Sequence, residues 1–366
     1  MNLSALKMTF FILVLLGVVG SMAYTFMRKD MFPGERGHDP VVYTSDDCKN
    51  ELVCDKASLF AEGQRNDIAT YHATLLQEDD IDYRVLTVSM TQDINLLAHQ
   101  QFMDMKVGQR SKSGRGLLLV IAIGNFEGGG EVRLEVSAGL EGVYTDAFVS
   151  YIQHRQMVPF FKAGRVADGI LATTEMIVTR AIEAKEGKEF SPPMKSVSTG
   201  AGAANSAQIG AGEDTSLKQK AAPKLEGLQG ASPQQILDLY TWTLEQRNAN
   251  PDLDIYTRAT RQWKKTWVVT PAQMNNEFQS LKRCGKGETK IKGNYAVIRF
   301  GPPKSKRECN PFFFEKEDGV WRMNFLMLMK AVRFNHRNEW HFDLSTKHPY
   351  GFAFTDWSFD RYGFPH

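Results

Sequence analysis

The segment at residues 136–148, VSAGLEGVYTDAF, holds two carboxylates, two glycines and a threonine within eight positions: Glu141, Asp146, Gly139, Gly142 and Thr145. Carboxylate oxygens are the ligands that a hard cation such as Ca²⁺ prefers. The same residue types also suit a strand-to-helix turn, because glycines permit positive φ and Thr145 can cap a helix that starts with Asp146. Only Glu141 has no duty in this structural interpretation.

A cation site on this segment needs further oxygens, since Ca²⁺ takes about six to eight of them. Asp55, Glu127, Glu141 and Asp146 can converge at one edge of a sheet, with backbone carbonyls completing the set. If the site forms, its cofactor is Ca²⁺ or another divalent cation. Phosphoryl transfer there would also need a cationic clamp, and Arg115 is the one cation plainly nearby in sequence.

Signatures of the common enzyme classes are absent from the sequence. EVSAG at 135–139 is not a nucleophile elbow, because Glu135 replaces its first glycine. No Walker A, G-x-G-x-x-G or H-E-x-x-H motif occurs. His336, His341 and His348 are loosely spaced, which favours solvated or edge-strand histidines over a metal site. The paucity of catalytic groups favours a binding protein over an enzyme.

Residues 8–27 contain no charge and are long enough to span a bilayer as one helix. A cleaved signal peptide is the alternative, with a small-x-small cleavage site at 21–23. Both interpretations export the rest of the chain, although Arg28, Lys29 and Arg36 favour the opposite orientation by the positive-inside rule. We expect a single-pass anchor in the inner (cytoplasmic) membrane, with the folded domains in the periplasm or outside the cell.

The four cysteines fall into two local pairs, Cys48 with Cys54 and Cys284 with Cys309. Each pair lies within one predicted folded region, as is typical of disulfides in an oxidising compartment. No C-x-x-C motif occurs, so redox or zinc chemistry has little support. Free, partly buried thiols are the alternative.

Charge is distributed unevenly along the chain. Residues 257–307 carry 13 Lys and Arg against two Glu, net +11, whereas residues 46–189 carry 22 acidic and 15 basic side chains, net −7. The stretch RATRQWKKTW at 258–267 mixes aromatics with four cations, Arg258, Arg261, Lys264 and Lys265. Such surfaces bind nucleic acid or anionic lipid, and predicted export favours anionic lipid or an acidic partner over nucleic acid. The alternative is a solvated helix face with Trp263 and Trp267 in the core.

The sequence from 340 to 366 has nine aromatic residues in 27 positions, which is too apolar for a free tail. It either packs on its own domain or docks on a partner, where aromatics such as Trp357 and Phe359 supply anchor contacts. The sequence leaves these two alternatives open for the tail, residues 346–366.

Residues 55–185 alternate helical and strand patterns, which predicts an α/β sandwich with helices on both faces of its sheet. Helical periodicity marks 64–78, 94–105, 145–157 and 164–184, and strand patterns mark 83–90, 116–123 and 131–137. The run GLLLVIAI at 116–123 is continuously apolar, as in a strand buried on both faces. Ahead of this domain we expect the anchor segment at 1–27 and a stalk at 28–54.

Residues 186–231 are rich in Gly, Ala, Ser, Gln and Lys and predict a flexible linker. A second domain, 232–345, begins at Ser232, which is an N-cap with a capping box closed by Gln235. Helices to about residue 282 and then strands at 289–300, 309–316 and 320–334 predict an α+β arrangement. This order resembles that of NTF2-like domains, which implies a cone that can hold a small ligand.

Four segments of the first domain occur in one order and at one spacing: CDKASLF (54–60), GRGLLLVIAI (114–123), AGLEGVYTDAF (138–148) and VPFFKAGRVADGI (158–170). Because of these four segments, the region of about residues 50–185 resembles the TPM-domain family. The resemblance implies an extracytoplasmic α/β/α sandwich beside a membrane segment. Phosphatase activity and divalent-cation binding are attributed to some members, and others are assembly factors for membrane complexes. The sequence departs from the family at Arg115, where an Asp is frequent, so a cation site has fewer carboxylates.

These observations predict a membrane-anchored extracytoplasmic binding or assembly factor for an envelope complex, such as one of the secretion type, with protein partners in that complex. The alternative is a divalent-cation-dependent phosphatase of the TPM type.

Overall fold

The structure of the protein is a computed structural model. It describes residues 48–126, 129–191, 206–209, 217, 219–220, 228–301, 307–335 and 337–366. The predicted membrane segment at 8–27 and residues 28–47 of the predicted stalk lie outside these residues. The predicted end of the stalk at residue 54 is wrong, because Val53 and Cys54 belong to a strand of the first domain (Val53–Asp55). Among the residues that the structure describes, no helix combines the length and the apolar character needed to cross a bilayer.

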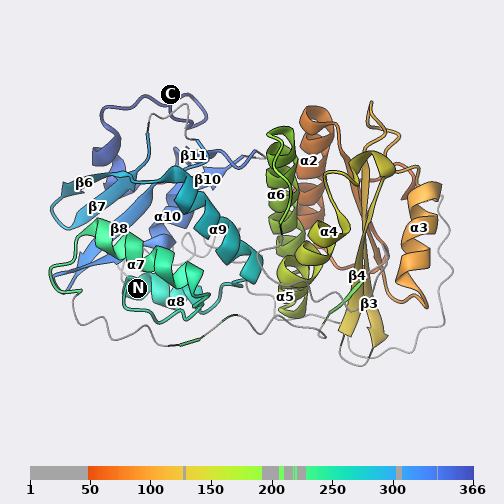
Figure 1. The fold of residues 1–366 in the computed structure, drawn as a ribbon, viewed down its shortest axis with the longest axis horizontal. Coiled ribbons are helices and arrows are strands. Elements are labelled where there is room, and N and C mark those ends of the chain that lie inside the picture. The colour runs from red at the N-terminus through yellow and green to blue at the C-terminus, as the bar shows by residue number, and fades with distance from the viewer. Residues whose placement is uncertain are drawn as a thin grey trace, which may run out of the picture. The chain divides into compact units, whose positions relative to one another are not determined.

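The first domain is built on a mixed sheet of five strands in the order β1-β2-β3-β4-β5. The strands are β1 (Val53–Asp55), β2 (Asp82–Val88), β3 (Gly116–Phe126), β4 (Gly129–Val136) and β5 (Ala207–Gln208). The first three run parallel, β4 is antiparallel to β3, and β5 is antiparallel to β4. The apolar run in β3 is fully buried from Leu117 to Ala122, because helices cover both faces of the sheet (Figure 1).

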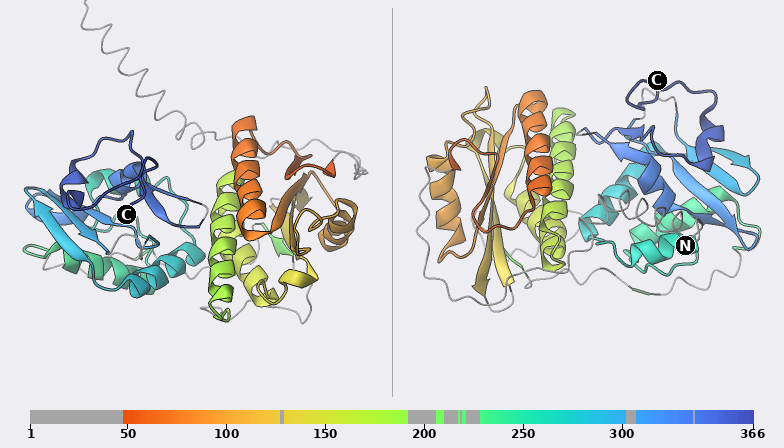
Figure 2. Two further views of the ribbon diagram at one scale, coloured as in Figure 1. Left: turned by 90° about the horizontal axis from the view of Figure 1, so that it is seen from above. Right: turned by 180° about the vertical axis from the view of Figure 1, so that it is seen from behind.

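Helices form two layers around this sheet, as predicted. One face carries α2 (Glu62–Asp79), α4 (Asp146–Ile152), α5 (Val158–Lys162) and α6 (Val166–Lys185), and the other face carries α3 (Ile94–Asp104) (Figures 1 and 2). Alternate residues of the strands feed two separate cores: Val85 and Leu119 pack under α2 and α6, whereas Leu86 and Val120 pack under α3. The predicted α/β sandwich is therefore confirmed for the first domain.

The predicted helix at 145–157 is divided into α4 and a π-helical turn (Gln153–Met157) that leads into α5. Gly164 then has a φ of +70° and ends α5. At Gly169 an added Cβ would lie 2.7 Å from the Cβ of Phe160. Two glycines of the motif at 158–170 thus have separate duties, one in the turn and one in the close approach of α5 to α6.

The predicted flexible linker is wrong at one point. Residues 206–209 include β5, which pairs Ala207 with Val132 of β4, and the Ile209 amide donates to the Gly130 carbonyl at 2.7 Å. Ala207 and Ile209 are buried in the core of the first domain. A strand of two residues is too short to give a periodic signal against a Gly- and Ala-rich background, so composition alone did not reveal it.

The second domain begins with α7 (Pro233–Glu245), whose N-cap Ser232 and capping box with Gln235 are as predicted. Two further helices follow, α8 (Arg258–Lys264) and α9 (Pro271–Cys284). An antiparallel sheet then runs in the order β6-β7-β8-β9, with β6 (Glu288–Lys292), β7 (Tyr295–Arg299), β8 (Phe312–Glu317) and β9 (Val320–Met323). The predicted α+β arrangement of helices followed by an antiparallel sheet therefore describes this domain.

Two predicted strands of the second domain are wrong in extent. The segment at 289–300 is the hairpin of β6 and β7, because Gly293 has a φ of +59° and reverses the chain. The segment at 320–334 is interrupted by α10 (Phe325–Ala331), whose N-cap is the Asn324 side chain. A short strand β10 (Val332–Phe334) then pairs with β11 (Trp340–Phe342). A hairpin turn joins β8 to β9, with positive φ at Asp318 and Gly319.

Both predicted disulfides are present, Cys48–Cys54 in the first domain and Cys284–Cys309 in the second, and no described cysteine is free. The first joins the chain before β1 to β1 itself, and the second joins the end of α9 to the segment before β8.

Candidate functional site

The segment at 139–146 forms a short 3₁₀ turn (Ala138–Leu140) and the N-terminus of α4. Thr145 is the N-cap, since its hydroxyl accepts the Phe148 amide, and Asp146 lies exposed in the first turn, as predicted. Two fully buried residues of the segment, Leu140 and Tyr144, anchor it in the core of the first domain. Its structural duty as a strand-to-helix turn is therefore clear.

The expected positive φ at Gly139 and Gly142 is wrong, since neither is among the glycines with positive φ. The 3₁₀ turn uses ordinary right-handed dihedrals, so it makes no demand that only glycine can meet. Glu141 is exposed, and among the described residues no hydrogen bond or ion pair engages it. As the sequence suggested, Glu141 is therefore the carboxylate of this turn that has no structural role.

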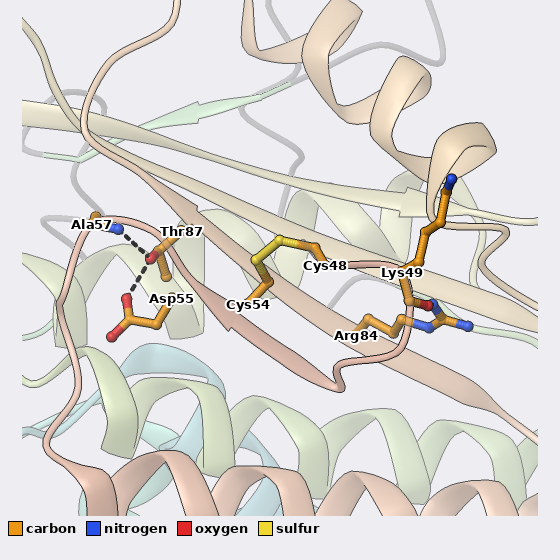
Figure 3. Close-up of a disulfide and its surroundings, with 7 residues drawn as sticks. All are labelled: Cys48, Lys49, Cys54, Asp55, Ala57, Arg84 and Thr87. Atoms are coloured by element: carbon orange, nitrogen blue, oxygen red, sulfur yellow. Dashed lines mark hydrogen bonds between the residues drawn. A yellow bond between two sulfur atoms is a disulfide. The ribbon is translucent and has the colours of Figure 1, made fainter. Parts of the chain in front are cut away.

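Asp55, at the end of β1, is engaged by its own domain (Figure 3). Its Oδ1 accepts the Leu59 amide at 2.9 Å and the hydroxyl of Thr87, and its Oδ2 accepts the Phe60 amide at 2.9 Å. The Thr87 hydroxyl also accepts the Ala57 amide at 3.1 Å. Since a carboxylate has about four lone-pair sites, most of the acceptor capacity of Asp55 is used to shape the turn between β1 and α2.

Strand register places Asp55 near the carboxyl ends of the parallel strands. Asp55 pairs with Thr87 of β2, and Thr87 pairs with Ile121 of β3. Glu127 of the predicted set lies outside the described residues.

The same register places Glu141 and Asp146 at the other end of the sheet. Because β4 is antiparallel to β3, its last residue, Val136, pairs with Leu117 at the start of β3. Leu117 and Ile121 are four residues apart, which is about 13 Å along a strand. The expected convergence of Asp55 with Glu141 and Asp146 at one edge is therefore wrong. Over the described part of the chain, no group of three or more His, Cys, Asp or Glu is arranged to hold a metal ion.

Arg115 lies at the same end of the sheet as Glu141. It precedes β3, and its Nη1 donates to the Asp79 carbonyl at 3.1 Å. A Cβ added at Gly139 would lie 3.9 Å from the carbonyl oxygen of Ser113, so the 3₁₀ turn lies close to the segment that precedes β3. Arg115, the cation expected near this segment, thus lies at the right end of the sheet, and no described hydrogen bond or ion pair joins its side chain to Glu141.

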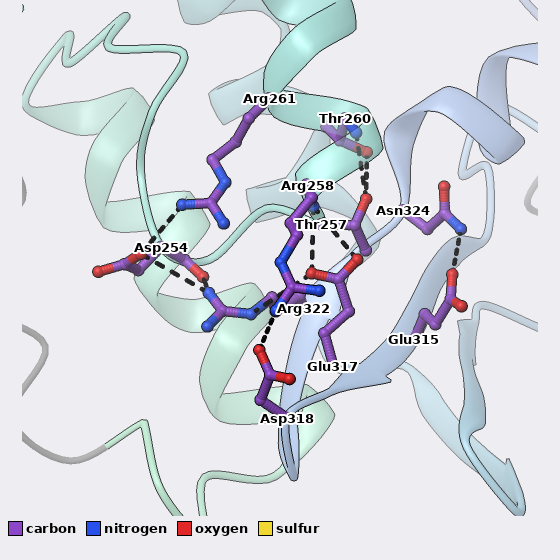
Figure 4. Close-up of polar contacts among 10 residues, drawn as sticks. All are labelled: Asp254, Thr257, Arg258, Thr260, Arg261, Glu315, Glu317, Asp318, Arg322 and Asn324. Atoms are coloured by element: carbon purple, nitrogen blue, oxygen red, sulfur yellow. Dashed lines mark hydrogen bonds and ion pairs between the residues drawn. The ribbon is translucent and has the colours of Figure 1, made fainter.

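The basic stretch of the second domain is largely neutralised by carboxylates of its own surface (Figure 4). Arg258 pairs with Asp318, and Arg261 pairs with Asp254 at 3.2 Å. Lys265 pairs with Asp252 at 2.9 Å. These carboxylates lie outside residues 257–307. The net charge of +11 counted over those residues is therefore larger than the positive charge of the surface around them.

Lys264 differs from the other three cations, because its side chain turns inward at the end of α8. Its Nζ lies 4.8 Å from the centre of the Tyr256 ring and 5.4 Å from that of Phe325. Its ammonium group therefore faces two aromatic rings rather than a surface patch.

The aromatic tail packs on its own domain, which decides between the two alternatives that the sequence left open. Trp357 and Phe359 are partly buried against the core of the second domain, and both lie within ring-contact distance of Trp340. The ring of Trp357 also faces the guanidinium of Arg299 at 4.8 Å. Their aromatic surface is therefore used mainly inside the domain.

One surface feature was not singled out from the sequence. On α3, Leu96 is 54% exposed and Met103 is 65% exposed, and residues seven apart lie on the same side of a helix. We call these two side chains the α3 stripe. The opposite side of α3, through Ile94 and Ala98, is buried on the sheet. The helical pattern does contain the signal, because Leu96 and Met103 lie off the buried face.

Comparison with known proteins identifies the first domain. Residues 53–180 match the family model described as TPM domain. Among solved structures, the chain is similar to the solution NMR structure of the N-terminal domain of a protein from P. gingivalis, with 23% identity, a TM-score of 0.32, and coverage of 41% of this chain and 98% of that chain. No curated protein matches the chain. The NTF2-like resemblance of the second domain stays a prediction. Residues 53–180 of this chain form a TPM domain.

Proposed function

We propose that this protein is a membrane-anchored, extracytoplasmic binding or assembly factor for an envelope complex, and that its TPM domain docks a protein partner on the α3 stripe. The anchor and the location rest on the uncharged segment at 8–27 and on the two disulfides. The observation that carries the docking surface is the exposure of Leu96 and Met103 on the helix of the less covered sheet face.

Exposed apolar side chains on a helix are anchor points when a partner covers them. Burying the exposed part of Leu96 or Met103 would contribute about 1 kcal/mol each, before the entropic cost of association. The sequence of the TPM region, 46–189, has a net charge of −7. A partner with an apolar contact patch and a basic rim has the matching chemistry, since complementary charge speeds association and excludes wrong partners.

The test replaces the α3 stripe in the full chain with Leu96→Lys/Met103→Lys. Partner recovery from native membranes is measured by quantitative mass spectrometry after reversible cross-linking. The control, Ile291→Lys/Leu344→Lys, makes the same change at two side chains of the second domain that are 56% and 62% exposed. We expect the first variant to lose one protein that wild type and control both retain, and equal recovery from all three would refute the docking surface.

A divalent-cation-dependent phosphatase of the TPM type is the second candidate. The specific observation in its favour is that Glu141, exposed and unengaged among the described residues, shares the sheet end of Arg115. Phosphatase activity is measured with and without Ca²⁺ or Mg²⁺ on wild type and on Glu141→Gln/Asp146→Asn. Cation-dependent turnover that the double variant loses would replace the binding-factor proposal with the enzyme.

A further inference from the structure

The outer edge of β4 in the first domain is covered by a strand that comes from a distant part of the sequence. β5 pairs antiparallel with β4, with Ala207 opposite Val132. The Ile209 amide donates to the Gly130 carbonyl at 2.7 Å. The edge of a sheet presents backbone groups with which another strand can pair, so residues 206–209 occupy a site for strand addition.

The side chains of this strand show which residue pattern the β4 edge accepts. Ala207 is 0% exposed and Ile209 is 5% exposed, whereas Gln208 between them is exposed. Side chains alternate between the two faces of a strand, and the two buried ones belong to the same apolar core as Val132. The edge therefore accepts a small apolar residue, a polar residue and a branched apolar residue in succession.

The length of the open edge is limited by a side chain of the same domain. The backbone groups of alternate β4 residues point to the outer side of the sheet, and Gly130 and Val132 meet the added strand there. At the next such position, the Leu134 amide donates to Oε1 of Gln153 at 2.7 Å. The edge thus has room for a short strand, which is what residues 206–209 supply.

Few interactions hold the added strand in place. They are two residue pairs, one further backbone hydrogen bond, and the burial of one alanine and one isoleucine side chain. The apolar gain from two side chains is of the same order as the entropic cost of fixing the backbone of a short strand. Residues 206–209 can therefore leave the edge while the rest of the first domain stays folded.

A second copy of the chain carries the strand that the vacated edge fits. Residues 192–205 precede it in the sequence, and a stretch of that length spans up to about 45 Å when extended. That reach exceeds the diameter of a small domain, about 30 Å. Exchange of an identical element between two copies is a low-cost route to a dimer. A second copy is favoured over an unrelated partner because its strand reproduces every contact of β5.

We propose that the β4 edge of one copy binds residues 206–209 of a second copy, so that two chains form a strand-exchanged dimer. Each copy donates its strand to the other, which gives the closed two-fold symmetry of most homodimers. The inference concerns the backbone edge of β4 and does not depend on a partner that docks on the α3 stripe.

The test uses the cross-strand pair of Glu131 and Gln208. Residues directly opposite in an antiparallel pair have Cβ atoms about 5 Å apart, which is close enough for a disulfide with a small adjustment. Glu131→Cys and Gln208→Cys are placed in two full-length copies with different tags, which are co-expressed, purified and oxidised. We expect a disulfide-linked dimer that carries both tags, and its share should rise with the total concentration of the chain.

The matched control is Glu135→Cys in place of Glu131→Cys. Glu135 lies on the same strand and the same face of β4, opposite Leu118 of β3. It is four residues from Glu131, about 13 Å along the strand, and so lies beyond the reach of Gln208. Co-expression with the Gln208→Cys copy should give at least about tenfold less of the mixed dimer. Equal yields would overturn the proposal, because they would reflect random collision of the chains.

The double variant Glu131→Cys/Gln208→Cys, made in one chain, checks the register of the pair. A disulfide within that chain, without any mixed dimer from the two single variants, would show that the strand stays on its own copy and would overturn the proposal. The absence of both disulfides would overturn the pairing of β4 with β5 itself.

The last arm tests the buried side chain of the strand. Ile209→Asp, added to the Gln208→Cys copy, places a carboxylate without a partner in an apolar site. It should lower the yield of the mixed dimer about tenfold or more. An unchanged yield would show that the cross-link does not require strand pairing and would contradict the proposal.

Discussion

The guanidinium of Arg299 in β7 binds the carboxylate of Asp356 through both terminal nitrogens, at 2.5 and 2.6 Å. Arg299 is 3% exposed, so the tail brings a charge to a buried partner rather than to another surface group. A second carboxylate, Glu288 of β6, accepts from the same guanidinium at 2.7 Å. Arg299 lowers the pKa of Asp356 to about 2, which keeps the pair ionised at neutral pH. The tail is thereby fixed to the sheet of the second domain.

The first prediction follows from this pair. Asp356→Asn should loosen the tail, because a neutral amide cannot replace the ionic pair to Arg299. Limited proteolysis at neutral pH should then cleave between residues 349 and 366 faster than in wild type. Asp318→Asn, which removes an exposed pair with Arg258, should leave cleavage unchanged. Equal cleavage of Asp356→Asn and wild type would mean that the aromatic contacts hold the tail by themselves.

The second prediction concerns Asp55. Asp55→Ala removes the acceptor of the Leu59 and Phe60 amides and of the Thr87 hydroxyl. It should lower the free energy of unfolding by about 2–3 kcal/mol, since several part-buried donors lose their partner. The exposed Asp146→Asn should change it by less than about 0.5 kcal/mol. Chemical denaturation followed by circular dichroism compares the two, and a neutral Asp55→Ala would refute the structural role of this carboxylate.

The main elements of the first domain could be predicted because each has a clear hydrophobic pattern. The run from Leu117 to Ala122 is apolar without alternation, and a strand covered on both faces demands that pattern. β5 gave no such signal, because its two residues, Ala207 and Gln208, are too few to show a periodic pattern. Likewise, the N-cap that divides β9 from β10 depends on one side chain, Asn324.

The predicted convergence of carboxylates in a cation site was wrong, because it depends on strand direction, which the sequence pattern does not specify. Alternating helices and strands suggested carboxylates meeting at one edge, as in a parallel sheet. β4 pairs antiparallel with β3, so β4 runs back and carries Glu141 to the opposite end from Asp55. The inward orientation of the Lys264 side chain could not be predicted either, because a run of charged residues does not indicate which of them faces inward.

The third prediction concerns the buried ion pair of β2. Arg84 is 2% exposed and Asp82 is fully buried; the guanidinium donates to the carboxylate at 2.7 and 2.8 Å. Arg84→Met should destabilise the first domain by about 3–5 kcal/mol, because it leaves Asp82 as an unpaired buried charge. Asp82→Leu/Arg84→Met should recover part of that loss, though the Gly108 amide then lacks its acceptor. Denaturant titration measures both, and a double variant no more stable than the single one would contradict this account.

The fourth prediction concerns pH. His72 is fully buried, stacks on Tyr83 at 4.1 Å and lies 3.3 Å from the Thr174 hydroxyl. Burial lowers the pKa of His72 from 6.5 to about 3. Between these values the unfolded chain binds a proton that the folded chain does not, so stability falls as pH falls, by up to about 1.4 kcal/mol per pH unit.

His72→Phe should flatten this dependence, because phenylalanine keeps the ring stack and does not titrate. The measurement is the free energy of unfolding of wild type and variant at pH 7 and pH 4.5. The wild type should lose more stability than the variant over this interval. The same loss in both proteins would show that His72 does not titrate with folding.

The most direct test of the proposed docking surface is site-specific photo-cross-linking of the full chain in native membranes. A photoreactive amino acid is placed singly at Leu96, at Met103, or at the exposed Asp146 on the far side of the same domain. The account predicts that positions 96 and 103 cross-link to one and the same protein and that position 146 does not. Cross-linking from position 146 without any from 96 and 103 would contradict it and would place the partner on the Glu141 turn instead.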